Sequence, residues 1–72
     1  MSEQIEINTE YIQLGQFLKL ANVLETGGMV KFFLTEYAVY VNGEPENRRG
    51  KKLYPGDLIE IEEVGSFTVT RK

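Results

Sequence analysis

Four of the eight basic residues of this 72-residue chain fall within five consecutive positions. They are Arg48, Arg49, Lys51 and Lys52. An arginine guanidinium can hold a phosphate through two hydrogen bonds, whereas a lysine ammonium acts as a mobile point charge. Such a cluster suits contact with a phosphate backbone, which positions a partner but reads no base sequence. A charged loop that only keeps the chain soluble would have the same composition, so the cluster alone leaves both interpretations open.

The formal net charge of −3 argues by itself against a nucleic-acid partner, because lysine and arginine drive phosphate binding. The distribution of charge matters more than the sum. The eleven acidic residues are spread from position 3 to position 63. Salt screens charges beyond about 8 Å, so a local cationic cluster can present a positive surface on an acidic protein.

The chain has no cysteine and no histidine. Disulfides and thiolate ligands are therefore excluded, and the commonest metal ligand and general base are both missing. Glu60, Glu62 and Glu63 offer carboxylates for a metal or an acid–base pair, but Glu60 and Glu62 alternate with Ile59 and Ile61 and should face solvent. We expect no enzymatic activity, no metal site and no cofactor.

No basic leader with an apolar run opens the sequence, and no stretch approaches the roughly 20 apolar residues of a membrane span. These features predict a cytoplasmic protein without a membrane partner. A chain of 72 residues has room for one hydrophobic core, so we expect a single domain over residues 1–72.

The first half of the chain predicts a strand and two helices. Residues 4–7 alternate polar and apolar, as in a short strand. The first helix begins at Leu14 and its apolar residues recur at helical spacing: Leu14, Phe17, Leu18 and Ala21. Thr26 and two glycines interrupt the pattern, and Thr26 can cap the helix that follows. The second helix repeats the spacing with Val30, Phe33, Leu34 and Tyr37.

The polar faces of these two helices carry four further candidates for contact with phosphate. Gln16 and Lys19 fall opposite the apolar side of the first helix, and Lys31 lies beside Thr35 on the second. Phe32 also falls outside the apolar stripe. We expect Phe32 to pack under the N-terminal strand, the alternative being an exposed ring on which a base could stack.

The second half of the chain predicts three strands. Val39 and Val41 alternate with Tyr40 before the turn pair Asn42-Gly43, and residues 44–52 form a polar loop. A turn at residues 54–57 precedes the alternating residues 59–61, and a last strand covers 67–70. We expect structural roles for Asn42, Gly43, Pro55, Gly56 and Asp57. The order strand, helix, helix and three strands is an α+β pattern.

Four segments together resemble the S-four RNA-binding domain, first known from a small-subunit ribosomal protein. They are residues 13–18, 26–31, 39–43 (V-Y-V-N-G) and 55–57 (P-G-D). The stretch 14–61 is closer still to the short bacterial proteins of the YaaA-like group. The arginine and aspartate often found at the start of the family's first helix are here Gln13 and Gly15, and the glycine usual before the strand is Tyr37.

This resemblance implies a small alpha-L domain, in which two short helices pack against a mainly antiparallel sheet. In the family, the two helices and the loop after the V-x-V-N-G strand form the RNA-facing surface. The resemblance implies that RNA is bound by Lys19, Lys31, Arg48, Arg49, Lys51 and Lys52. Gln16 and Thr35 join these candidates because of their positions on the polar helix faces. The implied partner is structured RNA, either ribosomal RNA or an assembling ribosomal subunit with its proteins. We expect a monomer to bind it through phosphate and shape contacts.

Two alternatives remain open at this point. A β-grasp carrier shares the V-N-G-E and G-D-x-I-E-I strings, but such carriers end in an activated glycine pair and this chain ends in Thr70-Arg71-Lys72. An adaptor could instead bind another protein by adding a strand to the exposed edge of the last strand. Fold determination separates the first alternative from an RNA-binding domain, and an RNA-binding assay separates the second.

Overall fold

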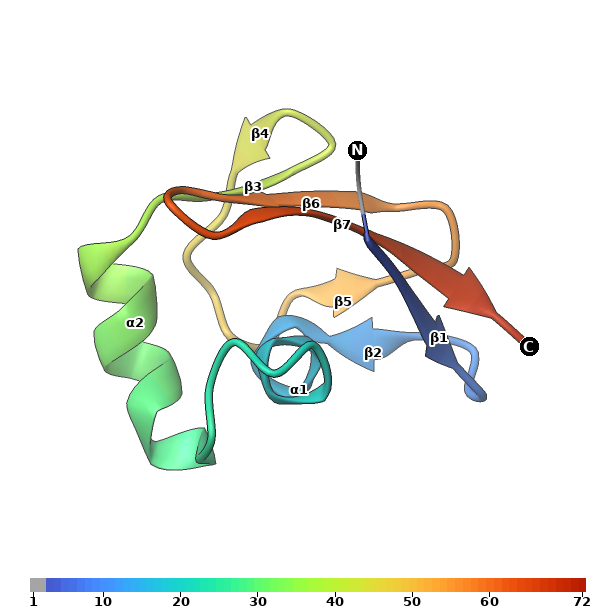
Figure 1. The fold of residues 1–72 in the computed structure, drawn as a ribbon, viewed down its shortest axis with the longest axis horizontal. Helices are drawn as coiled ribbons and strands as arrows, with labels where there is room; N and C mark the ends of the chain where they lie inside the picture. The colour runs from blue at the N-terminus through green and yellow to red at the C-terminus, as the bar shows by residue number, and fades with distance from the viewer. Residues whose placement is uncertain (1–2) are drawn as a thin grey trace.

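A computed structural model describes residues 3–72 and contains a five-stranded sheet with both helices on one face (Figure 1). The helical segments are α1 (Leu14–Leu20), a 3₁₀ turn η1 (Gly27–Met29) and α2 (Val30–Glu36). The strands are β1 (Glu3–Ile7), β2 (Ile12–Gln13), β3 (Val39–Val41), β4 (Glu44–Pro45), β5 (Lys52–Leu53), β6 (Leu58–Ile61) and β7 (Gly65–Arg71). Within the described residues, no helix has the length and apolar character needed to cross a membrane.

The five-stranded sheet has the order β1-β7-β6-β3-β4. Its pairings are antiparallel except for β1, which runs parallel to β7 with Ile5 opposite Val69. A separate antiparallel ribbon joins β2 to β5 and lies on the same side of the sheet as the helices (Figure 1). The predicted α+β class, with two helices against a mainly antiparallel sheet, is confirmed.

Three details of the predicted elements were wrong. Residues 44–52 were expected to be loop throughout, but their ends pair as β4 and β5, and β2 was not expected. Thr26 precedes η1 without a side-chain capping hydrogen bond. The last strand has no free edge, because β7 lies between β1 and β6, so the sheet edges are β1 and β4.

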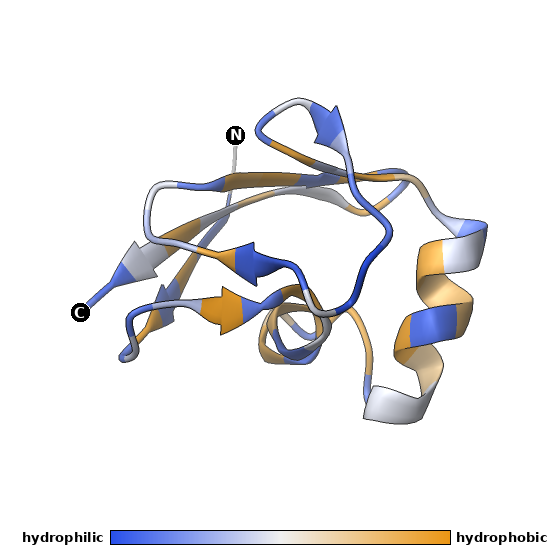
Figure 2. Ribbon diagram, turned by 180° about the vertical axis from the view of Figure 1, so that it is seen from behind, coloured by the Kyte–Doolittle hydropathy of each residue, from blue (hydrophilic) through white to orange (hydrophobic). Residues whose placement is uncertain are grey.

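The hydrophobic core lies between the sheet and the layer formed by the helices and the β2–β5 ribbon. Alternate residues of β3, β6 and β7 face it, as the period of two in the sequence predicted. Phe17 of α1 is fully buried, with its ring edge-on to that of Phe67 at 6.0 Å between centroids. Figure 2 shows hydrophobic residues along the helices and strands and, by contrast, a mostly hydrophilic connection between β4 and β5.

The two turns of the V-x-V-N-G and P-G-D motifs are bonded to each other. The Asn42 amide nitrogen donates to Asp57 Oδ1 at 3.1 Å, and the Leu58 N–H donates to Asn42 Oδ1 at 2.9 Å. The other Asp57 oxygen accepts from the Tyr54 N–H at 2.8 Å. Asn42 also takes a left-handed backbone conformation (φ 53°), which asparagine tolerates better than most residues. Asn42 and Asp57 therefore have the structural role that the sequence predicted.

Asn42→Ala is expected to lower the free energy of unfolding by about 1–3 kcal/mol, because both side-chain hydrogen bonds are lost and alanine is strained at positive φ. Urea denaturation followed by circular dichroism measures the loss. Asn47→Ala is the matched control, since the Asn47 side chain is exposed and makes no hydrogen bond in the described residues. Equal stabilities of the two variants would contradict the structural role of Asn42.

Candidate nucleic-acid interface

The basic loop of residues 46–52 is fastened to the start of α1 through its backbone. The Leu14 N–H donates to the Lys51 carbonyl at 2.8 Å, and the Gly15 N–H donates to the Arg49 carbonyl at 2.9 Å. The first N–H groups of a helix have no partner within the helix, and Gln13 makes no side-chain capping bond here. The loop carbonyls supply the missing acceptors, so the helix end and the basic loop hold one another in place.

Gly15 is the point where the loop, α1 and α2 come together. A Cβ atom added at Gly15 would lie 3.5 Å from Arg49 Cβ and 3.5 Å from a Val30 side-chain methyl. These are ordinary van der Waals distances. The cations of the loop therefore lie next to the polar faces of both helices, although they are far from them in sequence.

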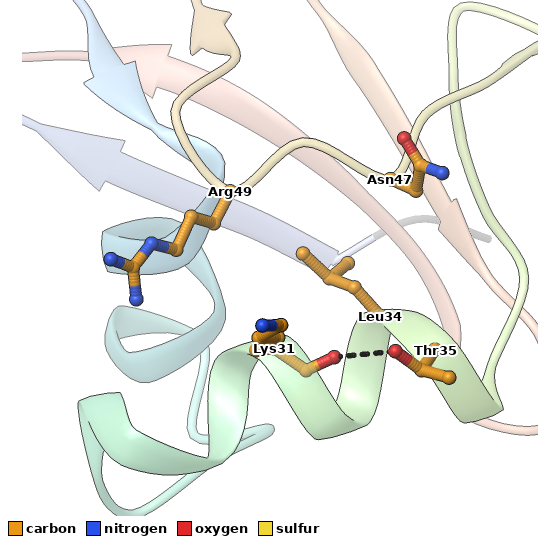
Figure 3. Close-up of a pocket in the computed structure, with 5 residues that line it drawn as sticks. All are labelled: Lys31, Leu34, Thr35, Asn47 and Arg49. Atoms are coloured by element: carbon orange, nitrogen blue, oxygen red, sulfur yellow. Dashed lines mark hydrogen bonds between the residues drawn. The ribbon is translucent and has the colours of Figure 1, made fainter.

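Two adjoining hollows share Arg49. The larger, of about 650 Å³, is lined by Lys31, Leu34 and Thr35 from α2 and by Asn47 and Arg49 from the loop (Figure 3). A smaller one, of about 270 Å³, has a lining that includes Gln16 and Lys19 of α1 together with Arg49 and Gly50. Arg49 thus lies between Lys31 on one helix and Lys19 on the other.

A third hollow, of about 540 Å³, lies further along the loop. Its lining consists of Arg48, Gly50, Lys51, Lys52 and Tyr54. We define the basic surface by the six cations of these three hollows: Lys19, Lys31, Arg48, Arg49, Lys51 and Lys52. The structure therefore gathers all eight residues predicted from the sequence, including Gln16 and Thr35, around one loop and two helices.

Some of the predicted residues already make hydrogen bonds within the protein, which reduces their capacity to bind a ligand. Arg48 forms a two-point ion pair with Glu46, at 2.9 Å from Nε to Oε2 and 3.3 Å from Nη2 to Oε1. The side-chain hydrogen bond from Arg48 is the main cause that lowers the pKa of Glu46. Arg48 is therefore the most neutralised of the six cations. Thr35 donates its hydroxyl proton to the Lys31 carbonyl at 2.9 Å. The Thr35 hydroxyl can therefore only accept a hydrogen bond from a ligand.

Lys52 is oriented by an aromatic ring. Its Nζ lies 4.8 Å from the centroid of the Tyr11 ring, and its strand position is paired with that of Gln13. Lys19 is partly buried, and its Nζ lies 3.6 Å from the place that a Cβ would take at Gly27. The Lys19 ammonium group therefore lies beside η1.

The expectation that Phe32 packs under the N-terminal strand is wrong. Phe32 is 64% exposed, whereas its neighbour Phe33 is buried. The reason is topological: β1 pairs with β7 at the edge of the sheet and does not cross α2. With no element over this side of α2, the ring has nothing to pack against.

The sheet face that points away from the helices has the opposite charge. Tyr40 and Glu60 alternate with buried residues and are paired across β3 and β6. Glu62 and Glu63 follow in the turn after β6, and all four residues line one hollow. Among the described residues, no group of three or more carboxylates could hold a metal ion. The acidic sheet face, defined by Glu60, Glu62 and Glu63, shares no hollow with the basic surface. Glu44, Glu46 and Asp57, by contrast, line a further hollow together with Lys51 and Lys52.

Sequence reasoning missed Tyr11 and Glu46, which contact Lys52 and Arg48. It also missed Tyr54, which lines a hollow with both of these cations. Glu46 stands two residues before Arg48, a spacing that offers a weak signal for a local ion pair. Tyr11 and Tyr54 are more than forty positions apart, and only the β2–β5 pairing brings them together. No pattern in the sequence indicates that pairing.

The sequence was compared with models of known protein families to assign the chain to a family. A family model described as the S4 domain matches residues 5–70. The chain belongs to the S4 domain family. This S4 domain chain is also 62% identical over 69 residues to a Bacillus subtilis (strain 168) protein named probable ribosome maturation protein RlbA, an alignment that covers 96% of this chain and 97% of that protein. The resemblance read from the four sequence segments is therefore confirmed, and the S4 domain replaces the β-grasp alternative.

Proposed function

We propose that this S4 domain protein binds structured RNA without catalysing a reaction, and that residues 1–72 act as one binding domain. The observation that carries the proposal is the convergence of Lys19, Lys31 and Arg49 on adjoining hollows. Cations from three separate segments form a broad positive surface, which suits several phosphates of a folded backbone better than one small anion. The hollows are lined mostly by polar and charged residues and glycines, whereas small-molecule sites are typically lined by apolar side chains.

The proposed partner is ribosomal RNA, free or in an assembling ribosomal subunit in the cytoplasm. The name of the Bacillus subtilis relative refers to ribosome maturation, and the high identity over nearly the whole chain supports carrying that role over. The acidic sheet face would be repelled by phosphate and therefore point away from the RNA. Contacts with ribosomal proteins would then fall on that face, and the protein is expected to act as a monomer.

The proposed recognition uses phosphate positions and helix shape, since the base edges of A-form RNA lie in a deep, narrow groove. A fluorescently labelled ribosomal RNA hairpin should bind several-fold more tightly than a DNA hairpin of the same sequence, because the phosphate spacing differs between the two forms. The logarithm of affinity should fall with the logarithm of salt concentration, by about 0.7–0.9 per phosphate contacted. Fluorescence anisotropy across a salt series measures both quantities.

A folded protein that binds neither hairpin at low ionic strength would contradict this function. The strand-addition alternative would then lead, with β1 as the strand that accepts a partner, because β1 is the longer edge strand of the sheet. Equal affinity for RNA and DNA would contradict the shape contacts while leaving the phosphate contacts in place.

A further inference from the structure

Two exposed tyrosines lie together beside the basic surface. Tyr11 comes immediately before β2 and Tyr54 immediately after β5, so the ribbon pairing brings them side by side. Their ring centroids are 5.9 Å apart, with the ring planes tilted by 44°. Tyr11 is 36% and Tyr54 46% exposed, so neither ring belongs to the hydrophobic core. The two rings contact each other across the β2–β5 ribbon, and a large part of each remains open to a ligand.

Cations line one hollow beside Tyr54, and a neighbouring hollow beside Tyr54 is lined by Lys51 and Lys52 together with Glu44, Glu46 and Asp57. Tyr54 lines the third hollow together with Arg48, Lys51 and Lys52, and the Lys52 ammonium lies over the face of Tyr11. Proteins that bind unpaired nucleotides combine these two features: an aromatic face stacks on a base while nearby cations hold the phosphates. Phe32 is more exposed, but it does not line any of the three hollows that carry the cations.

The backbone at Tyr54 is held in place from both sides. The Tyr54 N–H donates to an Asp57 carboxylate oxygen at 2.8 Å, and the Tyr54 carbonyl accepts from the Asp57 N–H at 3.0 Å. The Asp57 carboxylate is itself tied to Asn42. A ring on a fixed backbone loses little conformational entropy when a ligand binds, which favours its use as a binding surface.

We propose that Tyr54, supported by Tyr11, stacks on an unpaired base of the bound RNA while Lys51 and Lys52 contact the adjacent phosphates. This inference rests on the proposed function and adds a requirement to it: the RNA must present an unpaired nucleotide next to a structured stem. Stacking on a ring tolerates any base, because every base has a π-face. The site therefore selects for unpaired structure and not for base identity.

The test uses two labelled RNAs with the same stem, one fully paired and one with an unpaired loop that contains 2-aminopurine. Tyr54→Ala should lower the affinity for the looped RNA by about 5- to 100-fold and leave the paired RNA and the salt slope unchanged. Tyr54→Phe should retain wild-type affinity, because the ring remains. Tyr40→Ala is the matched control: Tyr40 is 38% exposed and lies on the acidic sheet face.

Circular dichroism first establishes that each variant is folded, and Tyr54→Leu, which keeps the bulk but not the ring, replaces Tyr54→Ala if that variant is not. An unchanged affinity of the ring-less variant for the looped RNA would overturn the stacking site alone. An equal loss on both RNAs would overturn it as well, because stacking requires an unpaired base. If the wild type binds neither RNA, the proposed function itself fails.

Discussion

Phe17→Ala is expected to destabilise the protein by about 3–5 kcal/mol. The Phe17 side chain is fully buried between α1 and the sheet and meets Phe67 edge-on. Its removal takes away a large apolar contact and leaves a cavity that a small core cannot close. A domain of this size has a stability on the order of 5 kcal/mol, so the substitution should leave a large fraction of the molecules unfolded at physiological temperature.

Phe32→Ala is the matched control for this prediction, since it makes the same chemical change at a ring that is 64% exposed. Its effect on the free energy of unfolding should stay within about 0.5 kcal/mol. Urea denaturation followed by circular dichroism measures both variants, because the chain contains no tryptophan for fluorescence. Similar losses of stability at Phe17 and Phe32 would contradict the described placement of α1 and α2.

Local patterns were sufficient to predict the main elements. The alternation of Val39 and Val41 with Tyr40, and of Ile59 and Ile61 with Glu60, predicted both strands and the face that each one buries. The helical spacing predicted α1 and α2 in the same way. These predictions succeed because a residue's side of a strand or helix depends only on its neighbours in the sequence.

Long-range pairings could not be predicted in this way. The parallel pairing of β1 with β7 joins residues more than sixty positions apart, and the two-residue strands β2 and β5 are too short to show a period. Phe32 was placed wrongly because the β1–β7 pairing was not foreseen, and the position of β1 determines whether this side of α2 is covered. The contact between Tyr11 and Tyr54 was missed because the β2–β5 pairing was not foreseen.

The candidate site was predicted by composition and family resemblance in combination. The cluster at positions 48–52 stood out by charge, while its position beside Lys31 and Lys19 followed only from the resemblance. The physical link is the pair of hydrogen bonds from the α1 amides to the Arg49 and Lys51 carbonyls. Backbone carbonyls carry no sequence signal, so this link could be seen only in the structure.

Binding of RNA by the basic surface can be tested by comparing two doubly substituted proteins. Lys31→Ala with Arg49→Ala removes two cations that share a hollow. Arg71→Ala with Lys72→Ala removes the same charge from the C-terminal end, which lies at the opposite end of the molecule from α2 (Figure 1). All four side chains are exposed, so both proteins should fold.

Titration of a labelled ribosomal RNA hairpin across a salt series is the measurement. We expect the Lys31 and Arg49 variant to lose about 10- to 100-fold in affinity at low salt and its log–log salt slope to be shallower by about 1–2. The Arg71 and Lys72 variant should keep the wild-type slope and nearly all of the affinity. Equal losses in the two variants would show that only the overall charge matters, and would contradict a localised RNA-binding surface.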